Sequence, residues 1–352
     1  MSNKIFYKNH IVFLLLSVLI ILASSCQINT LSDQSQDYSF TQNKKLGRGV
    51  NIIGYDPIWQ SRDRARFKEH YFQMIKDAGF STVRINLHAF RHMDRNNDYK
   101  LIDSWWEVLN WAVDNAIKSD LMVILDMHEY GSMGRNPENG KQALLAFWTQ
   151  VSERFKNAPD NVIFEILNEP SKQLTPELWN QYLKEALAII RKTNPNRMVI
   201  IGPGNYNQIK YLDQLELPEE DRNIIVTIHY YLPMEFTHQG AAWAAEYTNL
   251  SGVEWTGTEQ EKAAIRDDFA IAQKWAKEHN RPVFVGEFGA YDKAPMESRL
   301  RYLNFMTRTM EEFGFSWAYW QFDSDFIVYD INNEKWVESI LNALIPKEDR
   351  NL

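Results

Sequence analysis

At 352 residues the chain is long enough for one large domain or two ordinary ones, and its 45% hydrophobic and 24% charged residues are typical of a soluble globular protein. Its formal net charge of −8 argues against a nucleic-acid partner, which requires a basic patch, and leaves neutral substrates open. Aromatic residues are abundant, with 12 Trp, 16 Tyr and 19 Phe, and they suit either core packing or stacking on a sugar ring.

The N-terminus has the pattern of an export signal. Lys4 and Lys8 precede the apolar run IVFLLLSVLIILASSC, which has about the length of a signal-peptide hydrophobic region and is short for a membrane span. The run ends at Cys26, the only cysteine, and ASSC resembles the box at which bacterial lipoproteins are cleaved and lipidated. Leu22 stands one position too early for that box, so an ordinary secretory signal or a membrane anchor is the alternative.

We therefore expect residues 1–26 to be a lipoprotein-type signal peptide, with Cys26 as the lipidation site. The protein is then exported and either anchored at the bacterial cell envelope or secreted, and it meets a membrane only through that lipid. Residues 27–44 are polar and lack periodicity, which predicts a flexible tether. The mature chain has no disulfide, and a metal site would need ligands other than cysteine.

From residue 45 onward, short β-rich segments alternate with helical ones. Residues 64–79 carry apolar residues at steps of three and four, and residues 175–195 begin with the capping pair Thr175 and Pro176. Eight such units predict an α/β fold, a single (β/α)8 TIM barrel over residues 45–350. A doubly wound sheet is the alternative, although neither GxGxxG nor GxxxxGK[ST] occurs. The predicted strands are residues 49–55, 81–87, 121–128, 161–169, 197–204, 224–231, 282–289 and 316–322.

Polar and aromatic side chains gather where these strands end, which is where the active sites of barrels lie. The candidates, in chain order, are Arg84, His88, His128, Tyr130, Asn168, Glu169, His229, Tyr231, Glu287 and Trp320. Scattered polar residues would not favour strand ends so consistently, and these positions therefore predict one functional site.

Two of the candidates are carboxylates, Glu169 after the fourth strand and Glu287 after the seventh. We expect these strands on opposite sides of the ring, so that the two side chains face each other across the barrel mouth. Such a pair suits the cleavage of a glycosidic bond, because one protonated carboxyl assists the leaving oxygen while the other, ionised, attacks the anomeric carbon. A separation of about 5–5.5 Å indicates a covalent intermediate and retained configuration.

The neighbouring candidates suggest supporting roles, each with a simpler alternative. Arg84 can lower the pKa of the ionised carboxylate, unless it only pairs with Glu165 inside the barrel. Tyr231 can donate a hydrogen bond to the same carboxylate, and Asn168 can hold a sugar hydroxyl. His128 and His229 can bond other sugar hydroxyls or tune the acid, and the alternative for either is a satisfied strand-end histidine. His88 and Tyr130 are further candidates for contacts with the substrate. Trp320 can stack on the sugar, unless it belongs to the core.

Four aromatic residues in the predicted loops are candidates for further sugar stacking, and the alternative for each is that it anchors its own loop. They are Trp59, Tyr206, Trp243 and Trp255. If the two tryptophans of the long loop after strand six line a groove, several sugars bind and cleavage is internal.

The ordered motifs VRINLH, DMHEYG, FEILNEP, IHYY, VGEFGAY and WAYWQF resemble those of glycoside hydrolase family 5, over about residues 45–345. The resemblance implies a retaining barrel enzyme with Glu169 as acid/base and Glu287 as nucleophile. It also implies supporting positions at Arg84, His128, Asn168, His229, Tyr231 and Trp320. Members of this family mostly cut β-1,4-glucans, and some cut mannans or xyloglucan.

We therefore predict a monomeric, retaining endo-β-1,4-glucanase that acts on a β-linked polysaccharide or oligosaccharide and needs no cofactor and no metal. A β-mannanase or xyloglucanase with the same site is the nearest alternative. Two others are a glycan-binding surface lipoprotein without catalysis, and a metal-dependent hydrolase using His128, Glu129, His229 and Glu287. The chain has neither HExxH nor HxH, which disfavours the metal site.

Overall fold

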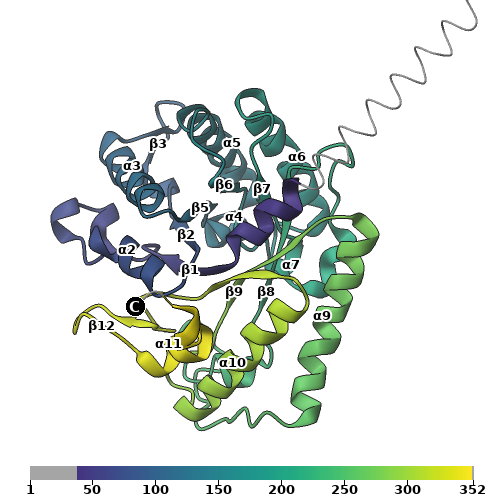
Figure 1. The fold of residues 1–352 in the computed structure, drawn as a ribbon. Coiled ribbons are helices and arrows are strands. Elements are labelled where there is room, and N and C mark those ends of the chain that lie inside the picture. Colours follow the sequence, from purple (N-terminus) through teal and green to yellow (C-terminus); the bar gives the residue numbers. More distant parts are fainter. Residues whose placement is uncertain (1–37, 351–352) are drawn as a thin grey trace, which may run out of the picture.

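The structure is a computed structural model that describes residues 38–350 (Figure 1). The predicted signal peptide, Cys26 and most of the predicted tether lie outside the described residues. Between residues 38 and 350, no helix combines the length and the hydropathy needed to cross a bilayer.

Eight parallel strands close into a barrel, which confirms the predicted (β/α)8 architecture (Figure 1). Around the ring they are β1 (Arg48–Ile52), β2 (Thr82–Leu87), β5 (Met122–Met127), β6 (Val162–Glu165), β7 (Val199–Ile201), β8 (Ile224–Tyr230), β9 (Val283–Phe288) and β10 (Ser316–Tyr319). Pairing of β1 with both β2 and β10 closes the ring, with Gly49 opposite Thr82 and Ala318. Nearly every strand residue is buried, because helices cover the outside and side chains fill the inside.

The helices form an outer layer around the barrel (Figure 1). They are α2 (His70–Asp77), α3 (Asp103–Lys118), α4 (Tyr130–Arg135), α5 (Pro137–Arg154), α6 (Pro176–Thr193), α8 (Met234–Thr237), α9 (Glu259–His279), α10 (Met296–Glu312) and α11 (Glu338–Leu344). The segment labelled α7 (Gly204–Asn207) is a left-handed turn, because Asn205 and Tyr206 have φ values of 53° and 65°. Short 3-10 turns occupy Pro57–Trp59, Arg62–Arg64, Phe90–His92, Ile209–Gln214 and Lys347–Asp349. Two small hairpins pair β3 (Met93–Asp94) with β4 (Lys100–Leu101) and β11 (Tyr329–Asp330) with β12 (Lys335–Trp336).

Local capping explains where several helices begin. Thr175 caps α6 and Pro176 occupies its first turn, as predicted. The helix predicted over residues 64–79 begins only at His70, because Asp56 accepts the backbone N–H groups of Arg66 and Phe67 and holds that stretch outside the helix.

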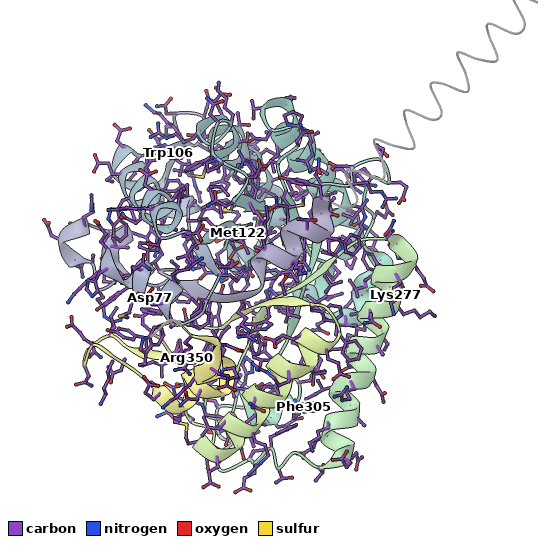
Figure 2. The ribbon with its side chains drawn as sticks, viewed as in Figure 1. Asp77, Trp106, Met122, Lys277, Phe305 and Arg350 are labelled. Carbon is purple, nitrogen blue, oxygen red and sulfur yellow. The ribbon has the colours of Figure 1, made fainter. Side chains whose placement is uncertain are left out.

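The core has two parts, one inside the barrel and one between the barrel and the helices. Met122, the first residue of β5, belongs to the inner part and lies near the middle of the view in Figure 2, whereas Lys277 on α9 points outward. The inner cluster is Leu46, Met122, Ile124, Ile163, Met198, Ile200, Ile225, Phe284 and Ala318. These apolar side chains fill the barrel near the amino ends of the strands, and polar side chains occupy the carboxyl ends.

The predicted tether is wrong at its described end, because residues 38–46 form a helix (purple in Figure 1). Leu46 packs into the inner core, and the Asn43 side chain donates to the Val283 carbonyl at 3.1 Å and accepts from Ser316 Oγ at 2.7 Å. Val283 and Ser316 begin β9 and β10, so this helix lies at the amino ends of the strands. The buried Asn43 is held by hydrogen bonds to strand ends, which a polar composition does not reveal.

Candidate active site

The ten predicted site residues all come to the carboxyl end of the barrel or to the loops beside it. Arg84, His229 and Glu287 belong to strands β2, β8 and β9, and the others follow strand ends. Asn168 and Glu169 lie beyond β6, which ends at Glu165, and Glu169 has a positive φ of 42°. The chain therefore leaves the strand before it presents this carboxylate.

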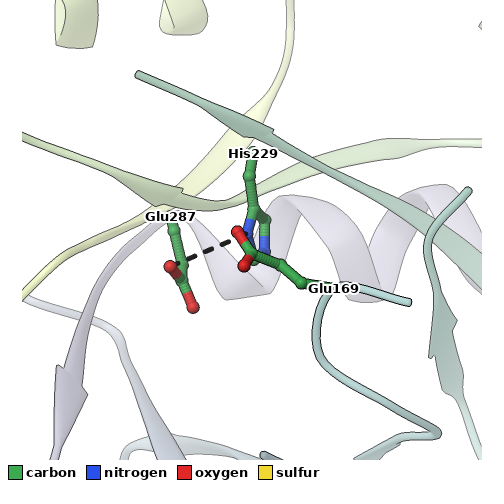
Figure 3. A group of neighbouring side chains, drawn as sticks. All are labelled: Glu169, His229 and Glu287. Carbon is green, nitrogen blue, oxygen red and sulfur yellow. Dashed lines mark hydrogen bonds and ion pairs between the residues drawn. The ribbon is translucent and has the colours of Figure 1, made fainter. Parts of the chain in front are cut away.

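The side chains of Glu169 and Glu287 lie close together at the barrel mouth. Their strands are three steps apart around the eight-stranded ring, with β7 and β8 between β6 and β9, which is one step short of the opposite sides that the sequence predicts. A carboxylate oxygen from each residue and a ring nitrogen of His229 all lie within 4.8 Å of one another (Figure 3). Two carboxylates this close fit the shorter of the two separations known for glycosidic cleavage, about 5–5.5 Å.

Glu287 is buried and held at both of its oxygens. Arg84 Nη1 donates to Oε1 at 2.9 Å, and the Tyr231 hydroxyl donates to Oε2 at 3.0 Å. Burial raises the pKa of Glu287 to about 7; the nearby Glu169 also raises it, whereas His229 and Arg84 lower it. The donors hold this carboxylate in one orientation and favour its ionised form.

Glu169 has a different environment. Its Oε1 lies 2.8 Å from His229 Nδ1, and burial raises its pKa to about 8, with the negative charges of Asp126 and Glu165 adding to the rise and Arg84 opposing it. Glu169 therefore keeps its proton to a higher pH than Glu287. Between about pH 7 and pH 8, the ionised group of the pair is mainly Glu287 and the protonated group is mainly Glu169.

Arg84 is fully buried and contacts both Glu165 and Glu287, the two carboxylates that the sequence suggested as alternative partners. It forms two hydrogen bonds with Glu165, at 2.7 and 2.8 Å, in addition to its bond with Glu287. It also bonds Asn51 Oδ1 at 2.8 Å and lies 3.1 Å from Asp126 Oδ2. Although burial lowers the pKa of Arg84, the charges of Asp126 and Glu165 raise it well above its usual value.

Replacement of Arg84 by Ala is expected to reduce the free energy of unfolding by about 3–5 kcal/mol, because Asp126 and Glu165 would remain buried without their cation. Urea unfolding followed by circular dichroism measures this change. The control is Arg266→Ala, which breaks an exposed ion pair with Glu312 and should change little. Equal stability of the two variants would show that the buried network does not depend on Arg84.

Asn168 and His128 complete the floor of the site. Asn168 Oδ1 accepts from Arg84 Nη2 at 2.8 Å, which orients its amide and leaves the NH₂ group as a donor. His128 Nδ1 lies 2.6 Å from Asp126 Oδ2, and burial holds the pKa of His128 well below 6.5. A neutral His128 with its proton on Nδ1 offers Nε2 as an acceptor.

Trp320 lies flat against His128, with ring centroids 5.4 Å apart and planes 8° from parallel. His88 and Tyr130 border the same histidine, at centroid distances of 5.1 and 5.4 Å. Burial lowers the pKa of His88 to about 3, and its Nε2 has no partner within residues 38–350. These residues form an aromatic wall beside the two carboxylates.

Four residues of this site were not among the candidates predicted from the sequence: Asn51, Tyr55, Asp126 and Asn207. Asp126 stands two residues before His128 and therefore faces the same way along the chain, a signal that could have been used. Tyr55 is 54% exposed, and its ring lies 5.2 Å from His88 and 6.2 Å from Trp320. Nothing in the local pattern marks Asn51 or Asn207.

The four loop aromatics that the sequence suggested for sugar stacking fall into a buried pair and a pair that is at least partly exposed. Trp59 and Trp255 are 5% and 1% exposed, so the prediction that they stack on sugars is wrong. Trp59 Nε1 donates to the Ile53 carbonyl, and Trp255 packs against Tyr302 and Phe305. Both tryptophans anchor their loops.

Trp243, by contrast, is 55% exposed and lies 4.8 Å from Tyr291, between ring centroids. Phe326 links this pair to Tyr231, the donor to Glu287. Tyr206 is partly exposed in the loop after β7. An exposed aromatic surface therefore adjoins the carboxylate pair.

Glu129 does not join the set that the metal-site alternative requires. Its Oε1 accepts from the Phe90 backbone N–H and its Oε2 from Ser132 Oγ, both within 2.9 Å. The carboxylates and histidine that meet, within the described part of the chain, are Glu169, His229 and Glu287.

Comparisons with known proteins agree on one family. A family model described as Cellulase (glycosyl hydrolase family 5) matches residues 43–326. Endoglucanase H of Acetivibrio thermocellus is 30% identical over 87% of this chain, and the chain spans about a third (33%) of that protein. The solved structure of Thermotoga maritima Cel5A in complex with cellobiose is 39% identical, covers 87% of this chain and 100% of its own, and has a TM-score of 0.82. The structure of the same protein in complex with mannotriose is 38% identical to this chain, has the same coverage and has a TM-score of 0.82.

Proposed function

Because the chain belongs to glycosyl hydrolase family 5, we propose that it hydrolyses β-1,4-glucan internally, with retention of configuration, as an endoglucanase. The observation that carries this proposal is the carboxylate pair, with Glu169 and Glu287 oxygens within 4.8 Å and pKa values near 8 and 7. Glu287 is the nucleophile because Arg84 and Tyr231 hold it. Glu169 is the acid/base because it keeps its proton longer.

The reaction proceeds in two displacements. Glu287 attacks the anomeric carbon while the proton of Glu169 passes to the departing glycosidic oxygen, which leaves a glycosyl ester on Glu287. Esterification removes the negative charge of Glu287, so the pKa of Glu169 falls and its carboxylate can act as a base. Glu169 then takes a proton from water as that water attacks the anomeric carbon and releases Glu287.

The surrounding residues hold the sugar at the reacting carbon. The free NH₂ group of Asn168 can donate to the neighbouring hydroxyl, and the Nε2 acceptor of His128 can take another. Trp320 supplies a flat face for the ring, and its own orientation is fixed by stacking on His128. His88, Tyr130 and Tyr55 extend this wall beyond the cleaved sugar.

The pH dependence follows from the two carboxyl groups. Glu287 must be ionised, so kcat/KM should fall as the pH drops below about 7, and Glu169 must be protonated, so kcat/KM should fall as the pH rises above about 8. Initial rates with cellopentaose between about pH 5 and about pH 10 measure both limbs, because its sugar leaving group needs the proton of Glu169. An acid limb at the ordinary pKa of a glutamate would contradict the buried environment of Glu287.

The substrate class is tested by release of reducing ends from soluble cellulose, mannan and xyloglucan. We expect the highest kcat/KM on β-1,4-glucan, with Glu287→Gln as the blank for each polymer. β-Mannan is the second candidate, because Thermotoga maritima Cel5A was also solved with mannotriose. A preference for mannan or xyloglucan would replace the glucan assignment and keep the mechanism.

The exposed Trp243 supports an open groove and internal cleavage. Its replacement by Ala should raise KM for cellopentaose and longer chains about 3–10-fold, the scale of one lost stacking contact, and leave KM for an aryl cellobioside unchanged. Oligosaccharide kinetics measure the difference, and Trp255→Ala is the contrasting variant, which should lower stability instead. Equal effects of Trp243→Ala on short and long substrates would exclude a distant subsite.

We also propose that the protein is exported, lipidated at Cys26 and active as a monomer. Lys4, Lys8, the apolar run and ASSC support export and lipidation, and the assembly of the whole carboxylate site within one chain supports the monomer. Mass spectrometry of the mature N-terminus, compared with a Cys26→Ser variant, tests the lipid. Light scattering of the soluble domain tests the monomer.

A further inference from the structure

The loop after β7 has an unusual backbone that directs Asn207 into the barrel. Asn205, Tyr206 and Asn207 have φ values of 53°, 65° and 55°, three successive non-glycine residues in the left-handed region. Such residues are disfavoured there, most of all a bulky one such as Tyr206. The Tyr206 N–H donates to the Pro170 carbonyl at 3.1 Å, which ties this loop to the segment that carries Glu169.

Asn207 is fully buried, and the fold makes room for it. A Cβ atom at Gly202 would lie only 2.1 Å from Asn207 Oδ1, so the position tolerates no larger residue. The same Oδ1 has no hydrogen-bond partner among residues 38–350. A buried amide with an unpaired oxygen reduces stability, and this residue therefore needs an explanation other than packing.

The amide nitrogen of Asn207 supplies that explanation. Nδ2 lies 3.3 Å from His229 Nε2, and with the Asn207 amide in this orientation its NH₂ group donates, which assigns Nε2 as the unprotonated nitrogen of the ring. The proton of a neutral His229 is then on Nδ1. Nδ1 lies 2.8 Å from Glu169 Oε1 and 3.6 Å from Glu287 Oε2 (Figure 3).

We infer that Asn207 is a positioning residue that fixes His229 as the neutral Nδ1–H tautomer, so that His229 donates a hydrogen bond to the carboxylate pair without bringing a positive charge. The inference rests on the proposed function. His229 neither gives up nor takes a proton in either displacement. Its bond to Glu169 stabilises the carboxylate form that is needed when water attacks the glycosyl ester, while its neutrality lets Glu169 remain protonated before that.

A charged His229 would disturb this arrangement. An imidazolium 2.8 Å from Glu169 would lower the pKa of Glu169, so that the acid would lose its proton at a lower pH. The charged groups that act on His229 come from five elements: Arg84 on β2, Asp126 on β5, Glu165 on β6, Glu169 beyond β6 and Glu287 on β9. Burial lowers the pKa of His229 and Arg84 adds to that, whereas Glu287, Glu165 and Asp126 raise it, and the net result is a lowered pKa.

Asn207→Asp tests the inference, because an acceptor at Nε2 attracts a proton there while Nδ1–H still faces Glu169. His229 should then become an imidazolium, and the basic limb of kcat/KM should move down by about one pH unit or more. The control is Asn205→Asp, which adds the same charge two residues away in the same left-handed turn, where the side chain makes no bond to His229. It should leave the limb unchanged.

The tautomer is measured directly on the unsubstituted protein, without substrate, by ¹⁵N NMR with labelled histidine and His229→Gln for assignment. We expect a neutral Nδ1–H form of His229 near neutral pH, and this reading holds even if Asn207→Asp does not fold. An Nε2–H tautomer or an imidazolium would overturn the inference, as would equal shifts in Asn207→Asp and Asn205→Asp. Lack of activity on every β-glycan would overturn the proposed function and leave the tautomer result standing.

Discussion

Replacement of Glu287 by Gln is expected to abolish hydrolysis, with kcat reduced on the order of 10⁴-fold or more on every substrate. An amide cannot supply the ionised oxygen that forms the glycosyl ester, and the ionised oxygens of Glu287 are the ones that Arg84 and Tyr231 hold in place. Initial rates on soluble cellulose and on an aryl β-cellobioside measure the loss.

The control for this variant is Glu235→Gln, an exposed carboxylate on α8, which should keep full activity. Thermal unfolding of both proteins separates loss of chemistry from loss of fold. A further variant, Glu287→Ala, leaves space for a small nucleophile, and added azide should restore cleavage of the aryl substrate with an α-glycosyl azide as the product. A β-glycosyl azide would assign the nucleophile to another residue.

Replacement of Glu169 by Ala is expected to slow the cleavage of substrates with poor leaving groups far more than the cleavage of substrates with good ones. Loss of the general acid should slow cleavage of oligosaccharides about 10²–10⁴-fold, because the departing sugar oxygen needs a proton. Aryl glycosides with acidic phenols need little protonation, so the first displacement should be nearly unaffected. The basic limb of the pH profile, near pH 8 in the unsubstituted protein, should disappear as well.

A series of aryl β-cellobiosides with phenols of rising pKa measures this dependence in both proteins. The slope of log kcat/KM against phenol pKa should be steep for Glu169→Ala and shallow for the unsubstituted enzyme. Glu129→Gln, a buried carboxylate that bonds Phe90 and Ser132 instead of the carboxylate pair, is the matched control. Equal slopes in all three proteins would show that Glu169 is not the acid.

The sequence was sufficient for the barrel and for the catalytic candidates because both depend on local patterns. Apolar runs separated by helical periodicity imply parallel strands, and parallel strands bring their carboxyl ends to one face. Glu169 and Glu287 each stand at such an end, so their meeting needed no knowledge of packing. The separation of the two strands around the ring was misjudged, although the positions were sufficient to bring the side chains together.

Burial and side-chain partners could not be predicted from the sequence. Trp59 and Trp255 lie in loops on the catalytic side, like Trp243, and only packing decides that the first two are core. The helix over residues 38–46 was missed because its polar side chains satisfy strand ends far away in sequence. Asn207 acts through a turn whose left-handed backbone has no sequence signature.

The most direct test of the two-carboxylate mechanism is the configuration of the first product. Proton NMR during the first minutes of cellopentaose hydrolysis distinguishes α and β anomers before mutarotation mixes them. We expect the β anomer to accumulate first, since two displacements at one carbon restore its configuration. Initial accumulation of the α anomer would mean a single displacement by water and would contradict the assignment of Glu287 as a nucleophile.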